Sequence, residues 1–105
     1  MRKISIKAAK ALKGGYNFKG NNTTVIGGNM FLFNNLIATY HNGKLEIKDA
    51  GWQTATTQER LNTILKEFGT PYCIRQKKGV WVLTIKGGLC VAERVWKNGW
   101  NQIEN

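Results

Sequence analysis

Histidine, cysteine, proline and acidic residues are all scarce in this sequence of 105 residues. The single histidine and two cysteines are too few to complete a zinc site made of cysteine and histidine ligands. One proline and 42% apolar residues indicate a chain that folds into a compact globule and not a disordered tail. We expect one domain that spans residues 1–105, because a chain of this length is too short for two hydrophobic cores.

The acidic residues are too scattered for metal-dependent catalysis, which needs several carboxylates around one divalent ion. They are Glu46, Asp49, Glu59, Glu67, Glu93 and Glu104. The sequence also contains no nucleophile elbow, no glycine-rich phosphate-binding motif and no cysteine–histidine arrangement. His41 precedes Asn42-Gly43, a turn signal that offers no group to orient a general base. We therefore predict a protein without catalytic activity, cofactor or bound metal.

No segment of the sequence has the pattern of a secretory leader or a membrane span. Residues 1–7 are charged too early and too often for a leader, and no apolar run is long enough to cross a bilayer. Cys73 and Cys90 have apolar, strand-like neighbours, where a reduced cysteine packs as a small hydrophobic side chain. A disulfide between them is the less favoured alternative. The sequence thus predicts a cytoplasmic protein that contacts no membrane.

Positive charge is what the sequence has in excess, with 16 Lys and Arg residues and a formal net charge of +10. This imbalance favours a polyanionic partner such as nucleic acid, although charge also keeps small proteins soluble. Residues 2–19 contain six basic residues and no acidic one. Residues 4–13 have helical spacing, with lysines on one face, and Gly14-Gly15 ends the pattern. Because alanines bury little surface, we expect this helix to be loosely held.

The strongest helix signal spans residues 57–68. Apolar residues recur there at helical spacing, at Leu61, Ile64, Leu65 and Phe68. Thr56 and Glu59 form a capping-box pattern, in which each side chain bonds the backbone N–H of the other. Gly69 and Pro71 mark the C-terminal end. This helix is predicted to cover the sheet that the flanking segments form.

Arg60 lies beside the apolar stripe of this helix, so we expect its side chain to stay partly exposed. Together with Thr54 and Thr57 it is a candidate phosphate contact at a helix N-terminus. The alternative is that the threonines only cap the helix and Arg60 braces the preceding loop.

The segments on both sides of this helix predict antiparallel hairpins. The expected strands are residues 23–26, 30–33, 36–40, 44–48, 72–76 and 80–85. Asn42-Gly43 is a preferred type I′ turn, which places Tyr40 opposite Leu45. Turns are also expected at residues 27–29, 34–35 and, if the loop has two residues, 78–79. The basic residues around the 78–79 turn, Arg75, Lys77 and Lys78, fit either a contact surface or protection of an exposed sheet edge.

Residues 89–103 fit two interpretations, a short helix or strands. We favour strands, with a hairpin at Asn98-Gly99, because glycine pairs punctuate this region at strand spacing. Trp100 stands among cations, as stacking residues of single-strand binders do, although tryptophans more often close a small core. The predicted fold class is α+β, with an antiparallel, hairpin-built sheet, the 57–68 helix on one face and a short basic N-terminal helix.

Three stretches of the sequence resemble small accessory proteins of tailed bacteriophages. They are residues 22–25, 51–62 and 76–81. The similarity of spacing covers most of the chain after residue 16, whereas the stretch from Thr84 departs from the shorter ending of that pattern. The resemblance implies a phage-encoded protein that acts in the bacterial host cytoplasm, and it carries no activity or site residues.

Two functions fit these observations. The first is non-catalytic binding of DNA or RNA by a basic surface, with the contact residues Lys3, Lys7, Lys10, Lys13, Lys19, Arg60, Arg75, Lys77, Lys78 and Trp100. The second is inhibition of a host protein, in which the positive charge matches an acidic surface of that partner. Loss of nucleic-acid binding with added salt would favour the first function, and a stoichiometric complex that survives nuclease would favour the second.

Overall fold

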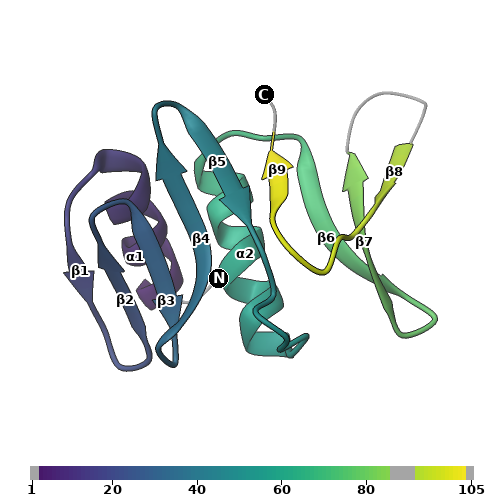
Figure 1. Ribbon diagram of the computed structural model, residues 1–105, viewed down its shortest axis with the longest axis horizontal. Helices are drawn as coiled ribbons and strands as arrows, with labels where there is room; N and C mark the ends of the chain where they lie inside the picture. The colour runs from purple at the N-terminus through teal and green to yellow at the C-terminus, as the bar shows by residue number, and fades with distance from the viewer. Residues whose placement is uncertain (1–2, 86–91, 104–105) are drawn as a thin grey trace.

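The computed structural model describes residues 3–85 and 92–103 as two helices and nine strands (Figure 1). In chain order the elements are α1 (Lys3–Gly14), β1 (Phe18–Lys19), β2 (Thr23–Ile26), β3 (Asn29–Leu32), β4 (Asn35–His41), β5 (Lys44–Ile47), α2 (Ala55–Glu67), β6 (Tyr72–Lys77), β7 (Val80–Ile85), β8 (Ala92–Val95) and β9 (Asn101–Ile103). The predicted α+β class is confirmed.

The strands form two antiparallel sheets. Six strands pair in the order β1-β2-β3-β4-β5-β9, and three pair in the order β6-β7-β8. Figure 1 shows α1 and α2 behind the six-stranded sheet, while its other face is open to the viewer. The three-stranded sheet extends the molecule at the end opposite α1, along a longest dimension of 38 Å.

The hydrophobic core lies between the helices and the sheets. From α2 it takes Leu61, Ile64 and Leu65, which are fully buried as the helical spacing predicts. From α1 it takes Leu12 and three alanines at 0% exposure, Ala8, Ala9 and Ala11. The expectation of a loosely held N-terminal helix is therefore wrong. Small side chains let the α1 backbone lie close to its neighbours, so the helix is packed tightly although each alanine buries little area.

The N-terminus of α2 is capped differently from the predicted capping box. Thr54 is the cap residue, and its Oγ1 accepts a hydrogen bond from the backbone N–H of Thr57 at 3.2 Å. The Glu59 carboxylate does not turn back to Thr56, because it binds Ser5 and Arg60 instead. The helix thus begins at Ala55, two residues earlier than the sequence predicts.

Two hairpins have the predicted register. At Asn42-Gly43 both φ values are positive, 53° and 75°, as a type I′ turn requires, and Tyr40 lies opposite Leu45. At Lys78-Gly79 the φ values are 51° and 77°, and Ile74 lies opposite Leu83. The side chains of Ile74, Leu83 and Trp81 are buried, in agreement with the predicted core face.

The turn between β3 and β4 differs from the prediction by one residue. Its two central residues are Phe33 and Asn34, at φ 49° and 65°, and Leu32 pairs with Asn35. The physical reason is burial, because this register keeps Leu32 and Ile37 in the core. As a consequence Phe33 leaves the strand and is 64% exposed.

The C-terminal region is built from strands, but the predicted hairpin at Asn98-Gly99 is wrong. β8 pairs with β7 and β9 pairs with β5, so the two strands belong to different sheets. The buried Asn101 side chain shapes the connection: its Nδ2 donates to the carbonyl oxygens of Lys97 and Ile47. Its Oδ1 accepts from the Lys97 N–H at 2.9 Å. Cys90 and the predicted strand start at residues 89–91 lie outside the described residues.

Candidate nucleic-acid interface

One side of α1 presents the largest group of basic residues in a single described element. We call this group the lysine face; it consists of the exposed residues Lys3, Lys7, Lys10 and Lys13. Steps of three and four residues place their side chains on adjacent turns of the helix. The opposite side of α1 is buried through its alanines and Leu12. The sequence pattern therefore both anchors the helix and directs its lysines to solvent.

The lysine face has few acidic neighbours. Its contacts are at the C-terminal end of α2, where Lys13 Nζ donates to the carbonyl oxygen of Glu67 at 3.1 Å. The Lys10 Nζ lies 4.0 Å from a Glu67 carboxylate oxygen, the outer limit for an ion pair. Within residues 3–85 and 92–103, Lys3 and Lys7 have no ion-pair partner. The N-terminal half of the lysine face is thus the part with the most uncompensated charge.

A second basic group lies at the far end of the molecule. We call it the hairpin cations; they are Arg75, Lys77 and Lys78, all exposed on or after β6. Figure 1 shows the β6–β7 turn and α1 at opposite ends of the molecule. Lys77 forms an ion pair with Glu93 of β8. The fold therefore does not join the predicted N-terminal and hairpin contacts into one surface.

Two other predicted contact residues lie apart from the lysine face. Lys19 is exposed on β1 opposite Thr24, whereas the preceding residue Phe18 packs against the core, so Lys19 points to the open side of the sheet. Trp100 is half-buried, and the Lys48 Nζ lies 4.4 Å from its ring centroid. A cation thus already covers one face of this predicted stacking residue.

Arg60 is buried, and the expectation that it stays partly exposed is wrong. Its side chain is 2% exposed. Its Nη1 donates to Ser5 Oγ at 2.7 Å and also binds the Glu59 carboxylate, while Nε donates to Thr23 Oγ1 at 3.0 Å. Its Nη2 donates to Asn22 Oδ1 at 3.1 Å. Arg60 therefore ties α1, β2 and α2 together from inside and does not reach a phosphate at the surface.

The threonines at the start of α2 also serve the structure. Thr54 caps the helix, and the Thr54 and Thr57 hydroxyl oxygens lie 3.0 Å apart within hydrogen-bond distance. With Arg60 inside the protein, the capping and bracing alternative describes these residues.

Two acidic residues are used inside the fold. Burial would raise the pKa of Asp49, but hydrogen bonds from Gln53, the Gly51 N–H and Trp96 hold it below its ordinary value. Burial likewise opposes ionisation of Glu59, yet hydrogen bonds from Ser5 and Thr63 and the Arg60 guanidinium lower its pKa. Both groups are ionised at neutral pH. The internal charges of Asp49, Glu59 and Arg60 sum to one negative charge, so the rest of the chain is more positive than +10.

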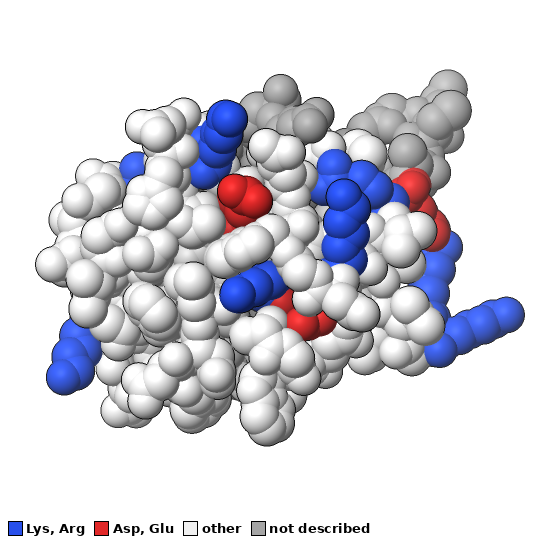
Figure 2. Space-filling model, viewed as in Figure 1, with Lys and Arg blue, Asp and Glu red and all other residues white. Residues whose placement is uncertain are grey.

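The face of the molecule that Figure 2 shows is much less charged. Over β1 to β4 most of its surface is uncharged, and the basic side chains lie apart from one another. Strand register places Thr24, Phe31 and Leu36 side by side on the sheet. All three are only half-buried. This open sheet face is a poor candidate for phosphate contact because it has few cations.

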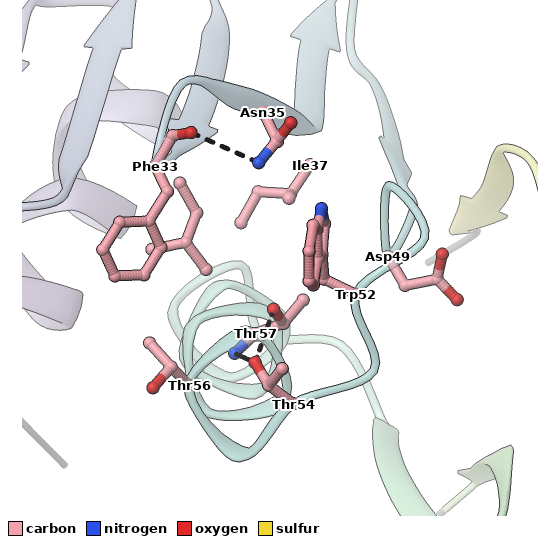
Figure 3. Close-up of a pocket in the computed structure, with 9 residues that line it drawn as sticks. Phe33, Asn35, Ile37, Asp49, Trp52, Thr54, Thr56 and Thr57 are labelled. Carbon is pink, nitrogen blue, oxygen red and sulfur yellow. Dashed lines mark hydrogen bonds between the residues drawn. The ribbon is translucent and has the colours of Figure 1, made fainter.

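A pocket of about 390 Å³ opens at the N-terminus of α2 (Figure 3). Phe33 from the β3–β4 turn and Trp52 from the loop before α2 stand at its two sides, with Ile37 between them. Phe33 is 64% exposed and Trp52 is 59% exposed. Sequence reasoning missed both residues as a site. A phenylalanine at a positive φ has no sequence signal, and only the fold brings the two segments together.

Comparison with known proteins places the chain in a phage family. The family model of the Kyanoviridae Gp96 protein matches residues 1–103. The chain belongs to this family. Kyanoviridae are phages, so the predicted resemblance to small phage proteins is confirmed. Neither a curated protein nor a solved structure matches the chain.

As a member of the Kyanoviridae Gp96 family, the chain is a phage accessory protein. Across residues 3–85 and 92–103, no helix combines the length and apolar character that a membrane span needs. The same part of the chain brings no three His, Cys, Asp or Glu side chains together as metal ligands. Cys73 is half-buried in β6. His41 is exposed at its turn, with Nε2 at 3.3 Å from Asn29 Oδ1.

Proposed function

We propose that this member of the Kyanoviridae Gp96 family binds DNA or RNA without catalysis, and that the lysine face of α1 contacts the phosphates. The observation that supports this most is the combination of exposed lysines with a buried, alanine-lined opposite side of the same helix. A helix held in this way presents its charges at fixed spacing, so binding orders mainly the lysine side chains.

The length of the lysine face suits a phosphate backbone. From Lys3 to Lys13 the helix rises roughly 15 Å, at about 1.5 Å per residue, a length over which duplex DNA carries about nine charges. Several phosphates therefore lie within reach of the four side chains. Lys3 and Lys7 have no ion-pair partner within residues 3–85 and 92–103, so no bound carboxylate has to be displaced by those phosphates.

The test is a fluorescence-anisotropy titration of labelled single- and double-stranded DNA and RNA, at about 50 and 200 mM salt. Each lysine that contacts a phosphate contributes roughly one unit to the slope of log K against log salt. Lys3→Ala with Lys7→Ala should reduce that slope by about two for the preferred nucleic acid and weaken its binding at both salt concentrations.

The matched control removes two exposed lysines elsewhere, Lys44→Ala with Lys97→Ala. This variant has the same net charge as the first, so it should bind almost as the wild type does. Equal losses in the two variants would contradict a localised interface. A stoichiometric complex with one host protein that survives nuclease, alongside weak and salt-insensitive nucleic-acid binding, would instead support the host-inhibitor alternative.

A further inference from the structure

We infer that the pocket between Phe33 and Trp52 binds one unstacked base of a single-stranded nucleic acid. The inference rests on the proposed function and adds a second kind of contact to it. The lysine face contacts phosphates, which every nucleic acid carries whatever its base sequence. The pocket takes a single unpaired base, so it favours single strands over duplexes.

The walls of the pocket suit a flat aromatic ligand. Figure 3 shows the Phe33 and Trp52 rings on opposite sides of the opening, with the Ile37 side chain between them. Both rings are more than half exposed, so each has a face free to cover an inserted base. The volume of about 390 Å³ lies within the roughly 300–1,000 Å³ range of small-ligand pockets.

The charge of the lining argues for a base and against a phosphate in the pocket. No lysine or arginine lines it, and Asp49 is its sole ionisable lining residue in the described part of the chain. The Asp49 carboxylate accepts hydrogen bonds from Gly51, Gln53 and Trp96 at 2.8–2.9 Å, and in Figure 3 it points away from the two rings. A neutral ligand is therefore favoured, since an anion would meet a carboxylate without a compensating cation.

The polar groups of Thr56 and Asn35 are turned away from the two rings. Both residues line the pocket, but Figure 3 shows the Thr56 hydroxyl and the Asn35 side-chain oxygen pointing away from the space between Phe33 and Trp52. Asn35 donates through Nδ2 to the Phe33 carbonyl oxygen at 3.2 Å. Stacking by the two rings therefore supplies the contact with a base, and such contacts tolerate any base.

Hydrogen bonds through Asn22 connect the Phe33 side of the pocket to the buried Arg60. The Phe33 N–H donates to the Asn22 carbonyl oxygen at 2.8 Å, and the Asn22 side chain accepts from Arg60. Arg60 also holds Ser5 of α1, which lies between Lys3 and Lys7 in the sequence. The buried side of the first turn of α1 is thus tied to α2, and the pocket opens at the N-terminus of α2.

The test compares two fluorescently labelled probes, a 15-nucleotide oligo-dT and an abasic oligonucleotide with the same backbone. Trp52→Ala and Phe33→Ala should each weaken oligo-dT binding about tenfold and leave binding of the abasic probe unchanged. Lys3→Ala with Lys7→Ala should weaken binding of both probes. Trp52→Phe should restore most of the oligo-dT affinity, because a phenyl ring still stacks. Tyr16→Ala is the matched control, an exposed aromatic residue lost outside the pocket, and should bind oligo-dT like the wild type.

The outcomes separate the two proposals. If the wild type binds both probes equally, or if Trp52→Ala and Phe33→Ala leave the oligo-dT affinity unchanged, the pocket inference is wrong and the lysine face stands. If the wild type binds neither probe nor any duplex, both proposals fail. If the two aromatic variants lose a host-protein complex and keep their oligo-dT affinity, the pocket takes an apolar side chain of that protein instead.

Discussion

The two basic ends of the molecule carry their charge in different ways. At one end, the lysine face is mounted on a helix that the core holds through fully buried alanines. At the other, the hairpin cations extend from β6, an edge strand of the three-stranded sheet. Lys77 there already pairs with Glu93, while Lys3 and Lys7 have no such partner within the described ranges.

This difference shows that similar runs of basic residues need not have the same role. Lysines on an edge strand discourage pairing with another sheet, which explains the hairpin cations without any ligand. Edge protection does not apply to a helix, so the lysine face lacks that explanation. The comparison therefore ranks the N-terminal end above the hairpin as the phosphate-binding surface, although the sequence offers both.

The largest effect is expected from Arg60→Met, which should destabilise the lysine end. The substitution leaves Glu59 without its cation. It also removes the guanidinium N–H groups that donate to the side-chain oxygens of Ser5, Asn22 and Thr23. Because the Glu59 side chain is 26% exposed, we expect a loss of roughly 2–4 kcal/mol, below the upper range for a broken buried pair. Urea denaturation measures the free energy of unfolding.

Lys66→Met is the control for this prediction, since it changes an exposed cation on the same helix. It should alter the free energy of unfolding by less than about 0.5 kcal/mol. Hydrogen exchange adds spatial detail: in Arg60→Met the α1 amides should lose more protection than the β6–β7 amides. Equal stability of the two variants would show that the buried cluster does not hold the lysine end.

A charge-matched pair of variants tests the ranking of the two ends directly. One replaces Lys3, Lys7 and Lys10 with alanine, and the other replaces Arg75, Lys77 and Lys78. Both remove three positive charges. The first should reduce the salt slope of nucleic-acid binding by about three, and the second by less than about one. The reverse order in anisotropy titrations would place the interface on the hairpin and overturn the ranking.

Acid should destabilise the protein, because folding lowers the pKa of two carboxylates, Asp49 and Glu59. For Asp49 and Glu59 the ordinary values are 3.8 and 4.5. Below these values the unfolded chain binds more protons than the folded chain, so stability is fully present above about pH 4.5 and falls as pH decreases through the folded pKa values. Urea midpoints measured between pH 7 and pH 3 should therefore decline.

Asp49→Asn separates the two contributions. It weakens the contacts with Gln53 and Trp96 and should cost about 1 kcal/mol at pH 7. Since the amide that replaces the carboxylate cannot ionise, the stability of this variant should decline less steeply on acidification than that of the wild type. An unchanged decline would assign the acid sensitivity to Glu59 and the other carboxylates.

Local sequence signals predict much of the fold. The α2 stripe, the Asn42-Gly43 turn and the Lys78-Gly79 turn each depend on neighbours within a few residues, and the burial of the stripe and the register of both turns are confirmed. The lysine face also follows from helical spacing alone. These features need no knowledge of the rest of the chain, which is why sequence reasoning reaches them.

The remaining features depend on contacts between distant segments. Arg60 is buried because Ser5, Asn22 and Thr23 supply acceptors from 37 to 55 residues away. Asn98-Gly99 is typical of a hairpin turn, yet the strand after it, β9, belongs to the six-stranded sheet and pairs with β5. No short window of sequence contains either fact. The same holds for the pocket, whose two rings come from separate loops.

Phe33→Gly is expected to change the free energy of unfolding least, and the sign of that change tests whether the Phe33 ring supports the fold. Phe33 occupies a left-handed conformation at φ 49°, which is costly for a bulky residue and free of strain for glycine. Because the ring is largely exposed, its removal loses little burial. Phe33→Gly should therefore leave the free energy of unfolding unchanged or raise it by up to about 1 kcal/mol, while oligo-dT affinity falls as in Phe33→Ala. A loss of stability above about 1 kcal/mol would mean that the ring supports the fold at this end, and would remove the argument that it is exposed for a ligand.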